Sequence, residues 1–329
     1  MYHQLTSQQR SQIFALLQRR TPRKDIALIV GCSQSTLSRE IKRNSTDKGN
    51  YLWDKAHAKA MGRRKRTTAN REKDPAIVWE ALELLKDEDW SPEQISAHMR
   101  ERGKSISHEL IYRHIRADES GKLASHCRHK MKYSRHGRPD RTTRVKNIPG
   151  RVSIHERPAE ADGSRFGDWE MDTIVGKDGK GAIVTLVERS TNMLLMERLP
   201  EGKRPEPLAK TVIRLLFPYR RTIRTITTDN GSEFCAHRLI SKALAPKGTK
   251  NPNLVFFADS YSSWQKGAVE NANKLIRQYI PKGTDFSDLS DAFIRKIQYK
   301  INRRPRKKLN FDTPKNVFFR LIANFALAS

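Results

Sequence analysis

Apolar and polar positions over residues 5–45 recur at helical spacing and predict three short helices. Thr21, as an N-cap, and Pro22, at the first helical position, begin the second helix, and Gly31 ends it. Ser33 then caps a third helix over residues 34–43. The positions expected to face inward are Leu5, Ile13, Leu16, Leu17, Ile26, Ile29, Val30, Leu37 and Ile41.

The outward face of this third helix is entirely polar or basic. A helix, a short turn with Gly31 and a polar-basic helix together predict a helix-turn-helix DNA-binding domain over residues 1–48. The alternative is an ordinary helical bundle whose charged face is only solvated. The residues expected to contact DNA are Gln34, Ser35, Ser38, Arg39, Lys42 and Arg43.

Residues 73–117 repeat this design. Ser91 and Gln94 form a predicted capping box, Gly103 ends that helix, and Ser107 caps the next one. We therefore expect a second helix-turn-helix, which has the same solvated-bundle alternative. The residues on its outward face that are expected to contact DNA are His108 and Arg113.

Two basic segments separate these predicted domains from the rest of the chain. Residues 49–72, with the run 63–66, are expected to form a basic linker, and residues 118–160 a linker or arm that becomes ordered on DNA. His126, Cys127, His129 and His136 lie in the second segment. They make a weak case for zinc, because a second Cys/His pair at finger spacing is missing.

Residues 161–325 have a different pattern, in which strands precede and then alternate with helices. Three strands joined as antiparallel hairpins, followed by helices and strands in turn, predict an α/β domain with a mixed five-stranded sheet. The segment 176–181 is interpreted as a hairpin turn, because it lacks the Lys-Ser/Thr end of a phosphate-binding loop. Ser232 is expected to cap a helix. The expected strands are 166–175, 182–187, 193–199, 223–228 and 255–258, and the last helices are 266–280 and 289–303.

Charge narrows the choice of partners. The chain of 329 residues has 64 Lys and Arg against 36 Asp and Glu, a net charge of +28, which nearly equal halves share. Such a charge indicates a polyanion, with nucleic acid before acidic lipid. No apolar run is long enough to span a membrane. Three distant cysteines do not make a disulfide framework and are typical of a reducing cytosol.

Three acidic residues lie at positions where a metal site can form. Asp172 lies within a predicted strand, Asp229 at the carboxyl end of another, and Glu270 on a helix beside Lys274 and Arg277. Hard divalent cations bind carboxylate oxygens, and two such ions can hold both oxygens of a displacement at phosphorus. Taken singly, each residue also fits a surface position, a turn or an exposed ion pair. The two basic residues are expected to hold DNA phosphates.

The segments FGDWEMD (166–172), TDNGSEF (228–234) and YSSWQKGAVEN (261–271) resemble the three acidic blocks of the insertion-sequence-thirty family of bacterial transposases. Residues 277–284 and 302–306 and the N-terminal helix-turn-helix are also similar to that family. The resemblance implies the DDE superfamily, with a ribonuclease-H-like core shared with retroviral integrases. It implies that Asp172, Asp229 and Glu270 are the catalytic and metal-binding triad.

The resemblance leads us to expect a DNA transposase that binds the terminal inverted repeats of an insertion sequence. Cleavage and strand transfer would use Mg²⁺ or Mn²⁺, as two ions, and the chain would act as a dimer or larger homo-oligomer on element and target DNA in the bacterial cytoplasm, at the nucleoid. The alternatives are a DNA-binding regulator derived from an inactive transposase and a nuclease that does not join strands. Asp168 and Glu170 are expected to be structural, and Trp264 to pack the site.

Overall fold

The computed structural model describes residues 4–69, 73–128, 130–131, 148–246, 248–249, 252–259 and 262–327. By internal contacts the chain divides into two units, Met1–Pro75 and Ala76–Ser329. None of the helices in the described residues is long and apolar enough to span a membrane.

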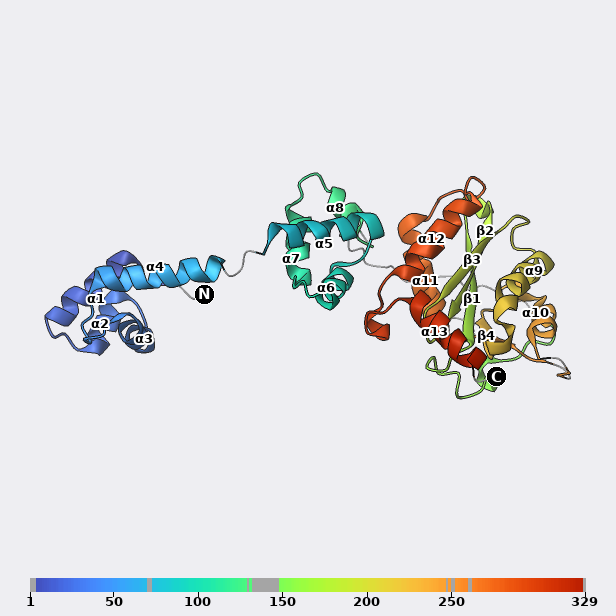
Figure 1. The fold of residues 1–329 in the computed structure, drawn as a ribbon, viewed down its shortest axis with the longest axis horizontal. Coiled ribbons are helices and arrows are strands. Elements are labelled where there is room, and N and C mark those ends of the chain that lie inside the picture. Colours follow the sequence, from blue (N-terminus) through green and yellow to red (C-terminus); the bar gives the residue numbers. More distant parts are fainter. Residues whose placement is uncertain are drawn as a thin grey trace. The chain divides into compact units, whose positions relative to one another are not determined.

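The N-terminal unit is a helical bundle (Figure 1). It contains α1 (Ser7–Gln18), α2 (Arg23–Val30), α3 (Gln34–Asn44) and α4 (Trp53–Ala69). Gly31 ends α2 in the left-handed conformation, at φ +71°, and the Ser33 side chain caps α3, as predicted. Two details of α2 differ: its N-cap is Pro22 rather than Thr21, and Ile29 is 59% exposed. Ile26, Ala27 and Val30 already fill the buried side of this two-turn helix.

Helix α4 lies where we expected a basic linker. Tyr51, just before it, and Ala56, in its first turn, are buried in the same core as Ile13 and Leu37. The Tyr51 hydroxyl donates to Glu40, which also pairs with the buried Arg10. The sequence did not reveal this helix, because most of its residues are polar or basic and few of its apolar side chains reach the core.

The first part of the second unit is another helical bundle, with α5 (Pro75–Glu88), α6 (Pro92–Glu101), α7 (His108–Ala117) and α8 (Lys122–Ser125). The predicted capping box at Ser91 and the Ser107 cap are both formed. Residues after α7 were expected to be an arm, but Leu123, Cys127 and Met131 pack against the core of this bundle. Residues 129 and 132–147, with His129 and His136, lie outside the described residues.

The α/β part has a mixed sheet of five strands in the order β3-β2-β1-β4-β5. Strand β1 pairs antiparallel with β2 and parallel with β4, β2 pairs antiparallel with β3, and β4 pairs parallel with β5. This confirms the expected architecture: helical modules followed by an α/β domain with a mixed five-stranded sheet. The strands are β1 (Asp168–Val175), β2 (Ala182–Glu188), β3 (Leu194–Leu199), β4 (Thr225–Thr228) and β5 (Val255–Phe257).

Helices cover both faces of this sheet (Figure 1). One apolar core lies between the sheet and α9 (Pro205–Leu216) and α10 (His237–Leu244), and Phe318 of α13 (Pro314–Leu327) packs into it. The other lies between the sheet and α11 (Gly267–Tyr279) and α12 (Asp291–Arg303). The short 3₁₀ helices are η1 (Ile154–Glu156), η2 (Lys177–Gly179), η3 (Phe217–Thr222), η4 (Ser232–Phe234), η5 (Ser263–Lys266) and η6 (Lys307–Leu309).

Two of these turns bear on the predictions. Turn η2 joins the antiparallel strands β1 and β2, which confirms the hairpin over 176–181. Ser232 does not cap a helix: it begins η4, and α10 starts only at His237. This extra turn places Phe234 in the apolar core that the sheet shares with α9 and α10.

Candidate active site

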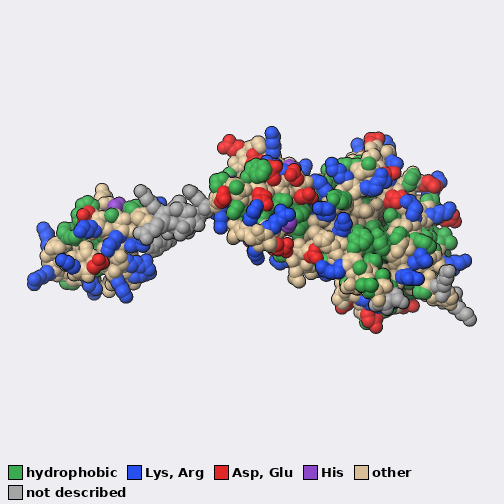
Figure 2. Space-filling model, in the orientation of Figure 1, with side chains coloured by type: hydrophobic (Ala, Val, Ile, Leu, Met, Phe, Trp, Pro, Cys, Tyr) green, Lys and Arg blue, Asp and Glu red, His purple; other side chains and the backbone are tan. Residues whose placement is uncertain are grey.

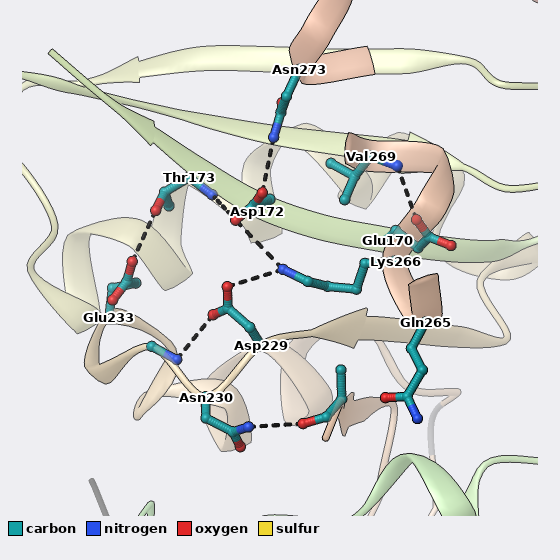
Figure 3. Close-up of polar contacts among 12 residues, drawn as sticks. Glu170, Asp172, Thr173, Asp229, Asn230, Glu233, Gln265, Lys266, Val269 and Asn273 are labelled. Atoms are coloured by element: carbon teal, nitrogen blue, oxygen red, sulfur yellow. Dashed lines mark hydrogen bonds and ion pairs between the residues drawn. The ribbon is translucent and has the colours of Figure 1, made fainter. Parts of the chain in front are cut away.

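Asp172 and Asp229 lie side by side because of the strand register. Glu170 of β1 is paired with Thr227 of β4, so two residues further along the parallel strands Asp172 comes opposite Asp229. Asp229 is the first residue after β4. Both carboxylates are directed at the same ammonium group, which belongs to Lys266 in η5 (Figure 3).

Lys266 lies between the two carboxylates. Its Nζ is 3.0 Å from Asp229 Oδ2 and 3.6 Å from Asp172 Oδ1, and its side chain is only 7% exposed. Burial by itself would lower the pKa of Lys266, but the two aspartates outweigh burial and raise that pKa. Burial raises the pKa of Asp172, and Lys266 opposes that rise. Two carboxylates thus share one buried cation, so the donor set fits a divalent ion.

The turn after β4 holds Asp229 in place. The Gly231 amide donates to Asp229 Oδ1, and the Asn230 side chain donates to the Ala258 carbonyl (Figure 3). The Thr173 hydroxyl and Lys203 both donate to Glu233, which ties this turn to β1. A Cβ at position 231 would lie 2.5 Å from Glu233 Oε2, so a larger residue there would displace the Glu233 side chain.

Helix α11 presents a polar face to this pair. Lys266 is its N-cap, and Glu270 and Asn273 follow at intervals of four and three residues, which places all three on one side of the helix. The Asn273 side chain donates to Asp172 Oδ2 over 2.9 Å. Glu270 is half-buried, and no hydrogen bond or ion pair to its side chain is found among the residues that the structure describes.

The structure therefore brings Asp172 and Asp229 together and leaves Glu270 apart from them. Within the described parts of the chain, no three His, Cys, Asp or Glu side chains are close enough to surround one metal ion. Glu270 lies on the correct helix face but is not in contact with the pair.

Asp168 and Glu170 are both buried and paired, as expected for structural residues. Asp168 accepts from Arg165 and from the Thr225 hydroxyl. Glu170 pairs with Arg189 over 2.9 Å and accepts from the Val269 amide in the first turn of α11. That last contact fixes the start of the helix that bears Glu270.

The predicted DNA contacts divide into two groups. All six residues predicted on α3 are exposed, as are His108 and Arg113 on α7 and Lys274 on α11. Figure 2 shows many Lys and Arg side chains over the visible face of the N-terminal unit. Arg277 differs, because it is half-buried and donates to the carbonyls of Val175 and Pro281.

Two further expectations concern single side chains. Trp264 was expected to pack the site, but it is 76% exposed, because η5 turns its side chain outward while Lys266 enters the site. His126 pairs with Asp89, and Cys127 packs against the second helical core.

Lys266 and Asn273 escaped the sequence analysis. The available signal was helical spacing: both are polar and lie one turn before and one turn after Glu270. That spacing indicates that the three residues share a helix face, but it does not by itself show that this face lies against the strand that carries Asp172.

Two comparisons with known proteins each match part of the chain. A helix-turn-helix domain model matches residues 1–44. The catalytic core domain of BIV integrase is similar in structure at a TM-score of 0.37 and 20% identity, covering 49% of this chain and 98% of that one.

Three curated transposases align with nearly the whole chain. The transposase of IS4351 from Bacteroides fragilis is 40% identical, over 100% of this chain and 99% of its own length. That of IS1086 from Cupriavidus metallidurans is 33% identical, over 98% and 96%. InsI of IS30A from Escherichia coli K12 is 30% identical, over 97% and 84%. The chain belongs to the family of transposases of IS30-type insertion sequences.

Proposed function

We propose that this transposase binds the terminal inverted repeats of its element and cleaves and joins DNA at a carboxylate site made of Asp172, Asp229 and Glu270. The observation that carries this proposal is the convergence of Asp172 and Asp229 on one cation, the ammonium of Lys266. Two carboxylates placed side by side do not stabilise the fold, because like charges repel. Their arrangement favours a site that binds a cation of higher charge than the lysine ammonium.

Asp172, Asp229 and Glu270 would hold two Mg²⁺ or Mn²⁺ ions. Bound divalent ions lower the pKa of water and offset charge on a phosphodiester. Hard ions of this kind take oxygen ligands, which matches the donor set. In this proposal Glu270, which shares a helix face with Asn273, joins the two aspartates when an ion binds.

The remaining polar residues position this site. Asn273 donates to one oxygen of Asp172, and the Thr173 amide to the other, so the carboxylate keeps a fixed orientation. Lys266, once displaced from between the aspartates, stays tethered at the start of α11, where its charge would offset that of a phosphate. The exposed indole of Trp264, two residues away, offers a surface for base stacking.

Recognition of DNA is assigned to the helical modules. Met1–Pro75 has 17 Lys and Arg against 6 Asp and Glu, and the exposed face of α3 includes Gln34, Arg39 and Arg43. Side chains of these types read base edges in the major groove. The exposed residues His108 and Arg113 on α7 would make a second contact. Because an element has two ends, we expect at least two copies on DNA, in the bacterial cytoplasm.

The test is incubation of the purified chain with labelled element ends, target DNA and Mg²⁺, followed by mapping of cut and joined products. We expect cleavage at the element end and joining of the freed 3′-hydroxyl, and we expect the Asp229→Asn variant to bind ends but not cut them. Binding without cleavage by the unchanged protein would indicate a regulator. Cleavage without joining would indicate a nuclease. Undiminished cleavage by Asp229→Asn would remove that residue from the mechanism.

A further inference from the structure

Three arginines gather around a cavity away from the carboxylate site. The cavity has a volume of about 330 Å³ and lies within Ala76–Ser329, between the helical bundle that contains α5–α8 and helix α11. Arg128, after α8, and Arg304 and Arg306, after α12, line it. The same walls include Leu275 of α11 and Gln94 of α6.

These guanidinium groups have no acidic partner of their own among the described residues. Arg304, only 3% exposed, donates to the Gln278 side chain and the Tyr279 hydroxyl. Arg306 donates to the Ile301 carbonyl, and Arg128 to the Asn271 side chain. Every one of these acceptors is neutral.

The single carboxylate in the cavity wall is already occupied. One oxygen of Asp89 is 2.8 Å from His126 Nδ1, and the other is 2.9 Å from Lys300 Nζ. The Nε atoms of Arg304 and Arg306 are buried and lack a hydrogen-bond partner in the part of the chain that the structure describes. Donors of this kind are rare in folded proteins, because an unmade hydrogen bond to a charged group is costly.

The charges also act on one another. Burial, followed by the charges of Arg304 and Arg128, lowers the pKa of Arg306 to about 10. Burial and Arg304 lower the pKa of Arg128. A pocket that concentrates positive charge and buried donors is unfavourable when empty and becomes favourable when an anion enters.

We propose that Arg128, Arg304 and Arg306 form a phosphate-binding site. Guanidinium groups bind phosphate oxygens through paired N–H donors. A phosphate therefore fits this cluster of three arginines better than a carboxylate does. A backbone phosphate of DNA is the occupant that we assign, and this choice of source rests on the proposed function. Asn271, the partner of Arg128, directly follows Glu270, so DNA held here would run along the helix that bears the third carboxylate.

The first test uses inorganic phosphate and the full chain, without any measurement of catalysis. Thermal unfolding is followed in sodium phosphate and in sodium chloride of matched ionic strength, for the unchanged protein and for Arg128→Gln, Arg304→Gln and Arg306→Gln. The control is Arg295→Gln, an exposed position on α12 with the same change in charge. We expect phosphate to raise the melting temperature of the unchanged protein and the control, and to lose this effect in the three variants.

Arg128 is exposed at the rim, so Arg128→Gln remains informative if a buried variant does not fold. A purely structural role predicts lower stability of the variants in chloride with an unchanged response to phosphate, and that result would overturn the proposal. An equal response to phosphate and chloride in the unchanged protein would also overturn it.

The second test separates the two sources of phosphate. Affinity for a DNA duplex is measured against salt for the unchanged protein, Arg128→Gln and Arg295→Gln. We expect Arg128→Gln to bind several-fold more weakly, with a log–log salt slope smaller by about one. If Arg128→Gln loses the response to free phosphate but keeps its affinity for DNA, the anion site stands and DNA is ruled out as its occupant. Failure of DNA cleavage alone would bear on the proposed function and leave this site intact.

Discussion

At the scale of single residues, Lys266 decides the charge balance of the candidate site. Its ammonium lies between Asp172 and Asp229, which the strand register places side by side, and offsets the repulsion between them (Figure 3). In the proposed function, a divalent ion would enter only if this ammonium moved. Lys266 and the ion would then compete for the same two carboxylates.

This competition predicts the behaviour of Lys266→Gln. Without a divalent ion, the variant should be less stable by about 2 kcal/mol, because two carboxylates then face each other unpaired and only one is well buried. Mg²⁺ should stabilise it more than it stabilises the unchanged protein. Thermal unfolding with EDTA or Mg²⁺ measures both effects, and Lys274→Gln, an exposed lysine on the same helix, is the control. Equal gains from Mg²⁺ in all three proteins would contradict the competition.

At the scale of elements, α11 matters most, because Lys266 is its N-cap and it contains Asn273 and the proposed third carboxylate, Glu270. Its start is fixed from β1 by Glu170, which accepts from the Val269 amide and pairs with Arg189. The position of Glu270 thus depends on a buried residue that itself touches no substrate.

Glu170→Gln should therefore disturb both stability and activity. The amide cannot balance the charge of Arg189, and breaking a buried ion pair costs about 3 kcal/mol. Urea unfolding measures this loss, and cleavage of element ends should fall with it. The exposed residue Glu206 of α9 provides the control, Glu206→Gln. Unchanged stability and cleavage in Glu170→Gln would mean that the start of α11 is held by other contacts.

The helical bundle of α5–α8 should respond to pH through His98, which packs edge-on against Trp90. Burial, helped by Arg102, lowers the pKa of His98 below its usual 6.5. Below about pH 6.5 the unfolded chain then binds a proton that the folded one does not, so stability falls as the pH drops through this window. His98→Gln should flatten that dependence in unfolding measured from pH 5.5 to 7.5. A matching change in His108→Gln, at an exposed position, would contradict the assignment to His98.

The elements that the sequence predicted well are those with local signals. Caps at Ser33, Ser91 and Ser107 and the turn at Gly31 fix helix ends through contacts only a few residues apart. Helix α4 was missed because it has many charged residues and too few buried apolar ones to give a helical periodicity. The pairing of Lys266 with both aspartates was missed because it depends on contacts across the sheet, which periodicity does not report.

At the scale of the whole molecule, the net charge of +28 is distributed over both units. Basic residues occur on the helical modules and on the α/β domain, so DNA should contact the chain over many phosphates. We therefore expect DNA bound by the helical modules also to contact the α/β domain.

This distribution predicts a steep salt dependence. The logarithm of the affinity for an end duplex should fall linearly with the logarithm of the salt concentration, by about 0.9 for each phosphate neutralised. Fluorescence anisotropy at salt concentrations from roughly 50 to 300 mM measures this slope. A nearly flat response would contradict extensive phosphate contact.

The central claim is that Glu270 acts together with Asp172 and Asp229, although only the two aspartates are in contact with a common group. The most direct measurement is single-turnover cleavage of element ends by Glu270→Gln in Mg²⁺, with end binding measured on the same sample and Glu206→Gln as control. We predict that Glu270→Gln binds ends normally and cuts them at least a hundredfold more slowly, on the order of the loss expected when a group that stabilises charge is removed. Cleavage at the rate of the unchanged protein would contradict the account.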